Sequence, residues 1–419
     1  MKFQSVKGMD DLFSPEIEKW QVLEQKSRTF FEAHGFREIR TPILESTELF
    51  SRSIGEATDI VHKEMYTFQD RGERSLTLRP EMTAGVVRAV LEHNLLKEQE
   101  PLFVYYLGAM FRAERPQAGR KRQFHQIGIE TLNTHSPVND AELIIIIKNY
   151  LDGLGLKKYV IKLNHLGSPE DRAQFTRDLS RYFTGVQSKL CKDCQFRLSH
   201  NVLRIFDCKM DSCQPLIEKA PKLKLSEQVQ SDFKKVTSLL EEAQVKFQAE
   251  PKLVRGLDYY TGLVFEVMGE GLGTQDAILA GGRYDSLIHD LGGPNVGASG
   301  FSIGVERLLA ALEAAGVSLE NSILADTVYV AALVQGEDSC VLYRKIALGL
   351  AEAGKRAHFS FATGSLSSHL GRANKMKARY AVIVGEDEWR SGEVSIKQMD
   401  TGAQKRIAPE LLAKELGKV

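Results

Sequence analysis

Residues 102–130 read LFVYYLGAMFRAERPQAGRKRQFHQIGIE, and this stretch decides how the chain can fold. Two apolar, aromatic segments flank the basic sequence AERPQAGRKR, in which Pro116 and Gly119 mark a turn. The pattern predicts an antiparallel hairpin whose two strands are joined by a long basic loop.

The alternation of side chains along a strand indicates which of them share a face. Gln126 and Glu130 fall on one face of the second strand, and Gly128 between them adds no side chain. The same parity groups Gly108, Met110 and Arg112 before the loop, and Tyr260, Gly262, Val264 and Glu266 in the later segment DYYTGLVFEV. We therefore expect three strands to line one pocket, which a ligand enters over the glycines.

Helical patterns lie on both sides of the hairpin. A helix is predicted from Pro15 and Glu16 to Gly35, with apolar residues recurring at helical spacing. The run DAELIIIIKNYLDGLG has the isoleucines of a buried strand, but its length favours a helix, with Asp140 as its cap and Gly153 as its stop.

Two further regions complete the organisation of the chain. Residues from about 170 to 250 are charged and lack the sheet pattern, so we expect an inserted helical domain there. Near the C-terminus, the apolar strands VYVAALV, HFSFAT and YAVIVG alternate with helices, which predicts a small α/β domain with a largely parallel sheet. The expected architecture is an α+β domain with a mainly antiparallel sheet over residues 1–325 and an α/β domain over residues 326–419.

The overall composition is that of an ordinary globular protein. Hydrophobic residues make up 43% of the chain and charged residues 26%. Fifty-five basic and fifty-five acidic residues cancel, so any contact with nucleic acid must be local. The N-terminus has no secretory pattern, and no apolar run approaches the roughly 20 residues of a membrane span. We expect a cytoplasmic protein that does not enter a membrane.

Two arginine side chains are the first indication of a site that binds an anionic ligand. Arg112 follows the first hairpin strand, and Arg307 falls in the first turn of the helix VERLLAALEAAG, where backbone N–H groups favour an anion. Both positions suit a phosphate ligand. A single arginine is nevertheless more often an exposed partner of a carboxylate, and that alternative is favoured for each arginine taken alone.

Five segments together resemble the class II histidyl-tRNA synthetases, in order and over nearly the whole chain. They are TPILESTELFSRSIGEATDIVHKEMYTFQDRGERSLTLRPE (residues 41–81), FRAERPQAGRKRQFHQIGIE (111–130), LVRGLDYYTG (253–262), AGGRYD (280–285) and GFSIGVERLL (300–309). Met82 departs from the family, in which many members have glycine at that position. The resemblance implies the class II synthetase fold, with an anticodon-binding domain at residues 326–419.

The resemblance also implies an activity and its partners. Histidine would be activated by ATP to histidyl-adenylate, with release of pyrophosphate, and then transferred to the 3′ end of tRNA(His). Mg²⁺ would accompany ATP, and the protein would be a homodimer with Pro42 near the interface. The alternative is a non-catalytic, synthetase-like regulatory subunit of histidine biosynthesis, although such proteins typically lack the anticodon domain.

Roles for individual residues follow from the same resemblance. Arg112 and Arg255 would be catalytic, on either side of the α-phosphate. ATP would be bound by Arg112, Arg120 and Arg307. Histidine would be bound by Glu81, Thr83, Gln126, Glu130, Arg255, Tyr259 and Tyr260, of which the first three would hold the ammonium group and Glu130 with Tyr260 the imidazole. Arg115 and Gln117 would lie near the acceptor end of the tRNA.

Four of the five cysteines lie in the expected insertion. Cys191 and Cys194 form C-x2-C, and Cys208 and Cys213 form C-x4-C, a spacing that would suit a structural zinc site. The family often has cysteines at similar places without needing a metal, so we expect none here. Basic residues between the cysteines instead suggest a face toward the tRNA acceptor arm.

Overall fold

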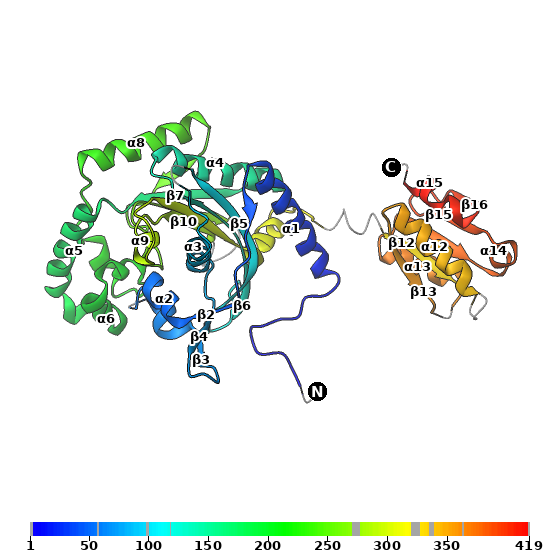
Figure 1. Ribbon diagram of the computed structural model, residues 1–419, viewed down its shortest axis with the longest axis horizontal. Coiled ribbons are helices and arrows are strands. Elements are labelled where there is room, and N and C mark those ends of the chain that lie inside the picture. Colours follow the sequence, from blue (N-terminus) through cyan, green and yellow to red (C-terminus); the bar gives the residue numbers. More distant parts are fainter. Residues whose placement is uncertain are drawn as a thin grey trace. The chain divides into compact units, whose positions relative to one another are not determined.

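The predicted hairpin is present in the structure, a computed structural model, as β5 (Leu102–Phe111) and β6 (Gln123–Leu132). The two strands pair antiparallel along their whole length, from Leu102 opposite Leu132 to Phe111 opposite Gln123. They are the second and third strands from one edge of an eight-stranded sheet (Figure 1). Its order is β1 (Arg37–Glu38), β5, β6, β11 (Ala298–Gly304), β10 (Ala277–Arg283), β9 (Leu263–Gly269), β7 (Tyr159–His165) and β8 (Phe247–Ala249). The pairs β1–β5 and β7–β8 at the two edges are parallel and the others antiparallel, so the predicted mainly antiparallel sheet is confirmed.

The structure describes residues 3–56, 58–97, 100–117, 119–269, 277–319, 327–334, 339–362 and 364–417. The chain divides into two compact units, one of Met1–Leu12 with Glu24–Val317 and the other of Phe13–Leu23 with Ser318–Val419. The predicted domain boundary at residues 325 and 326 lies outside the described residues and stays a prediction. Among the helices that are described, none is both long and apolar enough to cross a membrane.

The two faces of the large sheet have different surroundings. On one face, Tyr105 of β5 packs against Phe31 of α1 (Glu16–Ala33), with ring centroids 5.8 Å apart, and Phe31 stacks on Tyr150 of α4 (Pro137–Leu154) at 5.2 Å. On the other face, Tyr106 and Met110 join an apolar core with residues of α3 (Thr83–Glu92). This second face also carries Gln126 and Glu130, because alternate residues of a strand share a face.

A ligand was predicted to approach the sheet over the glycines of its second face. For Gly108 and Gly128 this prediction is wrong, because no space is left above them. A Cβ atom at Gly108 would lie 2.5 Å from Nη2 of Arg79, and one at Gly128 would lie 2.3 Å from Cζ of Tyr106. The space above both glycines is therefore filled by side chains of the protein itself. In the second case the filling side chain brings a hydroxyl group to Glu130.

Helix α4 begins differently from the prediction. Its cap is Ser136, whose side chain accepts a hydrogen bond from the backbone N–H of Val138, and Gly155 ends the helix in a left-handed conformation. Asp140, predicted as the cap, lies inside the helix and forms a buried ion pair with Arg283, Oδ1 to Nη2 at 2.8 Å. The carboxylate of Asp140 is thus held by an arginine far away in the sequence and not by the N-terminus of the helix.

Residues 169–218 are helical, as predicted for this part of the insertion. They form α5 (Pro169–Thr184), η2 (Gln187–Lys189), α6 (Lys192–His200), η3 (Val202–Asp207) and α7 (Gln214–Glu218). All of these except η2 contribute to one small hydrophobic core. The following α8 (Glu227–Glu242) packs against α4 instead, and β8 then joins the edge of the large sheet. The predicted helical stretch therefore ends in a short strand.

Smaller elements complete this unit. A three-stranded sheet has the order β2 (Leu44–Ser46), β4 (Ser75–Leu78) and β3 (Tyr66–Gln69). Helices α2 (Thr47–Ile54) and η1 (Ile60–Glu64) form a small core with Ala84 of α3, and α9 (Leu287–Asp290) joins the core of the second face. Helix α10 (Val305–Ala314) directly follows β11.

The second unit contains the predicted α/β arrangement. Its elements are β12 (Thr327–Ala332), α12 (Cys340–Glu352), β13 (Arg356–Ser360), α13 (Leu366–Lys375), β14 (Tyr380–Val384), α14 (Glu386–Ser391), β15 (Val394–Gln398), β16 (Gln404–Ile407), η5 (Pro409–Leu411) and α15 (Leu412–Leu416). The sheet order is β13-β12-β14-β15-β16. The first three strands are parallel, whereas β15 and β16 are antiparallel additions, so the sheet is less uniformly parallel than predicted.

Candidate active site

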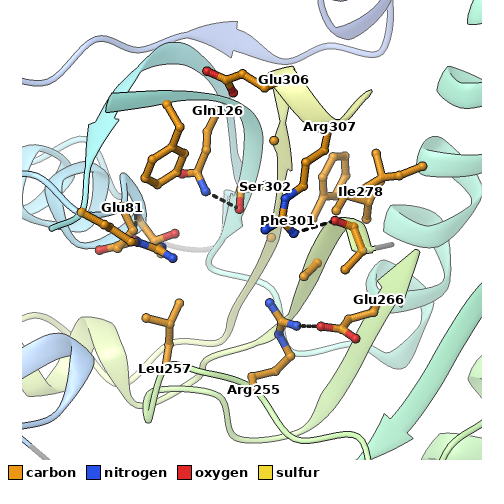
Figure 2. A pocket seen from close by; sticks show the side chains of 18 of the residues that line it. Glu81, Gln126, Arg255, Leu257, Glu266, Ile278, Phe301, Ser302, Glu306 and Arg307 are labelled. Carbon is orange, nitrogen blue, oxygen red and sulfur yellow. Dashed lines mark hydrogen bonds and ion pairs between the residues drawn. The ribbon is translucent and has the colours of Figure 1, made fainter. Parts of the chain in front are cut away.

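A pocket lies over the second face of the large sheet, and it gathers residues that are far apart in the sequence (Figure 2). Of the residues predicted for the site, it is lined by Glu81, Thr83, Arg112, Arg120, Gln126, Glu130, Arg255, Tyr259, Tyr260 and Arg307. Arg115 and Gln117 are exposed and are not among the lining residues. The backbone of Gln117 pairs with that of Arg120, which closes the loop between β5 and β6 into a tight turn.

Glu130 lies at the buried end of the pocket, surrounded by hydroxyl groups. Its Oε1 accepts hydrogen bonds from the Thr83 hydroxyl at 2.7 Å and from the Tyr106 hydroxyl at 3.4 Å, and its Oε2 accepts one from the Tyr284 hydroxyl. Burial, with a smaller contribution from nearby Glu81, raises the pKa of Glu130 to about 8 against the opposing effect of these donors. Glu130 can therefore gain or lose a proton near neutral pH.

Tyr106 and Tyr284 were not predicted as site residues. A signal for Tyr106 was present, because it lies directly opposite Gly128 in the hairpin and a glycine opposite a tyrosine makes room for the ring. Tyr284 follows the end of β10, in the AGGRYD segment, and no periodicity of the sequence directs it toward Glu130. Finding Tyr284 required the three-dimensional structure.

Glu81 is fixed by the first turn of α3. Its carboxylate accepts hydrogen bonds from the backbone N–H groups of Thr83 at 2.7 Å and Ala84 at 3.0 Å, and burial raises its pKa. Met82 between them has φ −108° and ψ −26°, which any L-residue can adopt. The departure from glycine at this position therefore places no strain on the loop.

Gln126 provides an acceptor in the same part of the pocket. Its Nε2 donates to Oγ of Ser302 on β11 at 3.3 Å. Its Oε1 is buried, and within the described residues no group donates a hydrogen bond to it. A ligand with an N–H group would satisfy this acceptor, since buried polar groups are normally hydrogen-bonded.

The other end of the pocket carries arginines. Figure 2 shows the guanidinium groups of Arg255 and Arg307 pointing toward one another from opposite sides of the pocket. Arg255 forms an ion pair with Glu266 on β9, whereas Arg307 donates to the carbonyl groups of Gly119 at 3.1 Å and Ala277 at 2.9 Å. Burial lowers the pKa of Arg307. An anionic ligand between the two groups would offset the cost of burying their charge.

Arg112 and Arg120 complete this cationic end. Arg112 donates through Nε to the carbonyl of Pro80 at 3.0 Å, and its guanidinium lies 5.1 Å from the centre of the Phe124 ring. Arg120 pairs with Glu114 at 2.8 Å and is partly exposed. The pocket thus has a carboxylate with hydroxyl groups at one end and a group of arginines at the other, an arrangement that suits a polar ring next to a phosphate.

The four cysteines of the insertion come together as well, although none of them lines this pocket. The Sγ atoms of Cys191, Cys194, Cys208 and Cys213 all lie within 4.8 Å of one another. Both the spacing of the cysteines in the sequence and the closeness of their sulfur atoms in the structure suit a metal site.

Comparisons with known proteins agree over the whole chain. A family model described as histidyl-tRNA synthetase matches residues 8–171 and 196–308, and one described as an anticodon binding domain matches residues 327–418. The chain is 42% identical over 421 residues to a histidine–tRNA ligase of Halothermothrix orenii, covering 100% of both, and 43% identical to one of Thermotoga maritima, covering 99% of this chain and 98% of that one. Its fold is similar to the crystal structure of apo Staphylococcus aureus histidyl-tRNA synthetase, with a TM-score of 0.80, 30% identity, and coverage of 99% and 100% of the two chains.

Proposed function

The chain belongs to the histidyl-tRNA synthetase family, and we propose from this membership that it activates histidine with ATP and transfers it to tRNA(His). The observation that supports this most directly is the pocket with two chemically distinct ends. A buried carboxylate with hydroxyl groups suits the imidazole, and the arginines suit the phosphates of ATP.

We assign the histidine side chain to the buried end. A ring N–H would donate to Glu130, and the hydroxyl of Tyr260 would bond the second ring nitrogen, with Tyr259 alongside; the centroids of the two tyrosine rings are 4.8 Å apart. The ammonium group would be held by the buried acceptors of Glu81, Thr83 and Gln126.

The arginines would hold ATP and carry the first step. The carboxylate oxygen of histidine attacks the α-phosphorus, a bond forms there, and the bond to pyrophosphate breaks. Arg112 and Arg255 would neutralise the charge that develops on the α-phosphate, while Arg307 and Arg120 would hold the outer phosphates. ATP would enter as its Mg²⁺ complex, so Mg²⁺ is part of the substrate.

The second step transfers histidine to RNA. A ribose hydroxyl of the terminal adenosine of tRNA(His) attacks the carbonyl carbon of histidyl-adenylate, and AMP leaves. Arg115 and Gln117 are exposed on the loop next to the pocket, where an acceptor end would approach. Residues 326–419 would bind the anticodon, and residues 1–325 with the insertion at about 170–250 would form the catalytic domain. We also propose a homodimer in the cytoplasm.

A regulatory subunit without catalytic activity is not favoured. The relatives compared above are named histidine–tRNA ligases, and this chain matches them over its full length, including the anticodon binding domain. A regulatory role would also give no reason for four arginines around one pocket.

The test is histidine-dependent exchange of labelled pyrophosphate into ATP, with the other amino acids as controls. Exchange with histidine alone is expected. Arg255→Ala should abolish it, whereas Arg181→Ala, which removes an exposed arginine of α5, should leave it unchanged. Absence of exchange in the folded wild-type protein would refute the proposal, and normal exchange by Arg255→Ala would refute the role of that residue.

A further inference from the structure

We propose that Cys191, Cys194, Cys208 and Cys213 bind one structural Zn²⁺ ion within the helical insertion. Their four Sγ atoms lie within 4.8 Å of one another, and none of the cysteines is in a disulfide. In a tetrahedral site with Zn–S bonds of about 2.3 Å, the sulfur atoms are about 3.8 Å apart. The distance between Sγ of Cys191 and Sγ of Cys208 is 3.8 Å.

The backbone around the cysteines favours thiolates. The N–H of Met210 points to Sγ of Cys208 at 3.4 Å, and the N–H of Cys191 points to Sγ of Cys213 at 3.3 Å. Such N–H donors stabilise negative charge on metal-bound sulfur, as outer-shell hydrogen bonds do in other metal sites. Four thiolates select a soft or borderline ion such as Zn²⁺ rather than Mg²⁺ or Ca²⁺. Sulfur atoms this close surround a single ion, because a cluster of several ions would hold them farther apart.

The insertion is the kind of structure that needs such a cross-link. Residues 169–218 share a small core, of which Cys194, Cys208 and Cys213 are themselves part. A core of this size contributes little stability, and natural units of similar size add a structural metal or disulfides. A metal here would join the start of α6 to the segments on either side of Met210, whereas disulfides are rare in the reducing cytoplasm.

The same segment supports the pocket. Between the two cysteine pairs, the side-chain amide of Asn201 donates to Asp258 at 2.9 Å, and the guanidinium of Arg204 donates to the carbonyl of Gly256 at 2.5 Å. Gly256 and Asp258 belong to the loop that carries Arg255 and Tyr260. A metal that holds η3 in place would therefore also position this loop. Zinc binding does not depend on which reaction the protein catalyses. Only the expected effect of this loop on histidine binding rests on the proposed function.

The first test is the metal content of the full-length protein, purified under reducing conditions without chelator. We expect about one zinc per chain by mass spectrometry. Replacement by Co²⁺ should give the visible bands of tetrahedral thiolate coordination. Cys191→Ser, at the half-buried edge of the cluster, should lose most of the metal, whereas Cys340→Ser, at an exposed position in the second unit, should retain it. Zinc-free protein with reduced thiols and no cobalt–thiolate bands would overturn the proposal, and so would stoichiometric iron; these results do not depend on how any variant folds.

The second test separates the metal from the reaction. Removing zinc from the wild-type protein should lower its melting temperature and raise the KM for histidine about fivefold or more, and adding zinc back should reverse both changes. An unchanged KM with full loss of metal would overturn the link to the pocket. Bound zinc without pyrophosphate exchange would leave the metal site standing and would refute the proposed function instead.

Discussion

Glu130→Gln should remove a pH dependence from the stability of the protein. The pKa of Glu130 is about 8 in the folded protein, compared with 4.5 for an ordinary glutamate. Because the folded pKa is the higher one, the contribution of Glu130 to stability is fully present below pH 4.5 and is lost as the pH rises through about 8. The full difference corresponds to roughly 5 kcal/mol, since each pKa unit is about 1.4 kcal/mol.

The assay is urea unfolding, followed by circular dichroism, of the wild-type protein and the variant at several pH values. Between about pH 5 and about pH 8, the free energy of unfolding of wild type should fall by ~4 kcal/mol relative to Glu130→Gln. Neighbouring Glu81 is present in both proteins, so its own titration largely cancels in this difference. Glu313→Gln makes the same chemical change at an exposed position and should match wild type. A constant difference between wild type and Glu130→Gln over this range would refute the reasoning.

Three other substitutions test separate parts of the structure. Arg283→Met leaves Asp140 buried without its partner and should cost about 3–5 kcal/mol in urea unfolding, part of which a second change, Asp140→Asn, should restore. Gly128→Ala places a methyl group against the ring of Tyr106 and should destabilise the protein by about 1–3 kcal/mol, measured in the same way. Arg307→Ala removes a charged hydrogen-bond donor and should raise the KM for ATP in pyrophosphate exchange by about tenfold or more, with little change in the KM for histidine. Equal changes in both KM values would contradict the assignment of Arg307 to the phosphates.

Local pattern predicted the elements of the sheet well, because strand alternation and turn residues act over a few positions. The two strands around Pro116 and Gly119 pair antiparallel as predicted, and Gln126 and Glu130 share a face. The pocket itself could not be derived this way. Arg255 and Arg307 belong to segments far from the hairpin in the sequence, and only the family resemblance grouped them with Glu130 before the structure did.

The sequence failed where a long-range contact outweighed a local preference. Asp140 has the chemistry of a helix cap, but pairing with Arg283 satisfies both charges in the interior, and Ser136 caps the helix instead. The prediction of open space above Gly108 was also made from local sequence alone. A glycine indicates that something approaches closely, and only the structure identifies that group as the guanidinium of Arg79.

The hydrogen bonds of Glu130 indicate how the pocket would select its ligand. An ionised carboxylate has about four positions for accepting hydrogen bonds. The hydroxyls of Thr83 and Tyr106 take two positions on Oε1, and that of Tyr284 takes one on Oε2, so one accepting position on Oε2 is not used by these hydroxyls and could accept a ring N–H. That N–H would be a further donor opposing the effect of burial, so histidine binding should lower the pKa of Glu130 and release a proton near pH 7. An amino acid without a ring N–H would leave this buried acceptor unsatisfied, and a site built for a hydrogen bond rejects such analogues more strongly than an apolar pocket could.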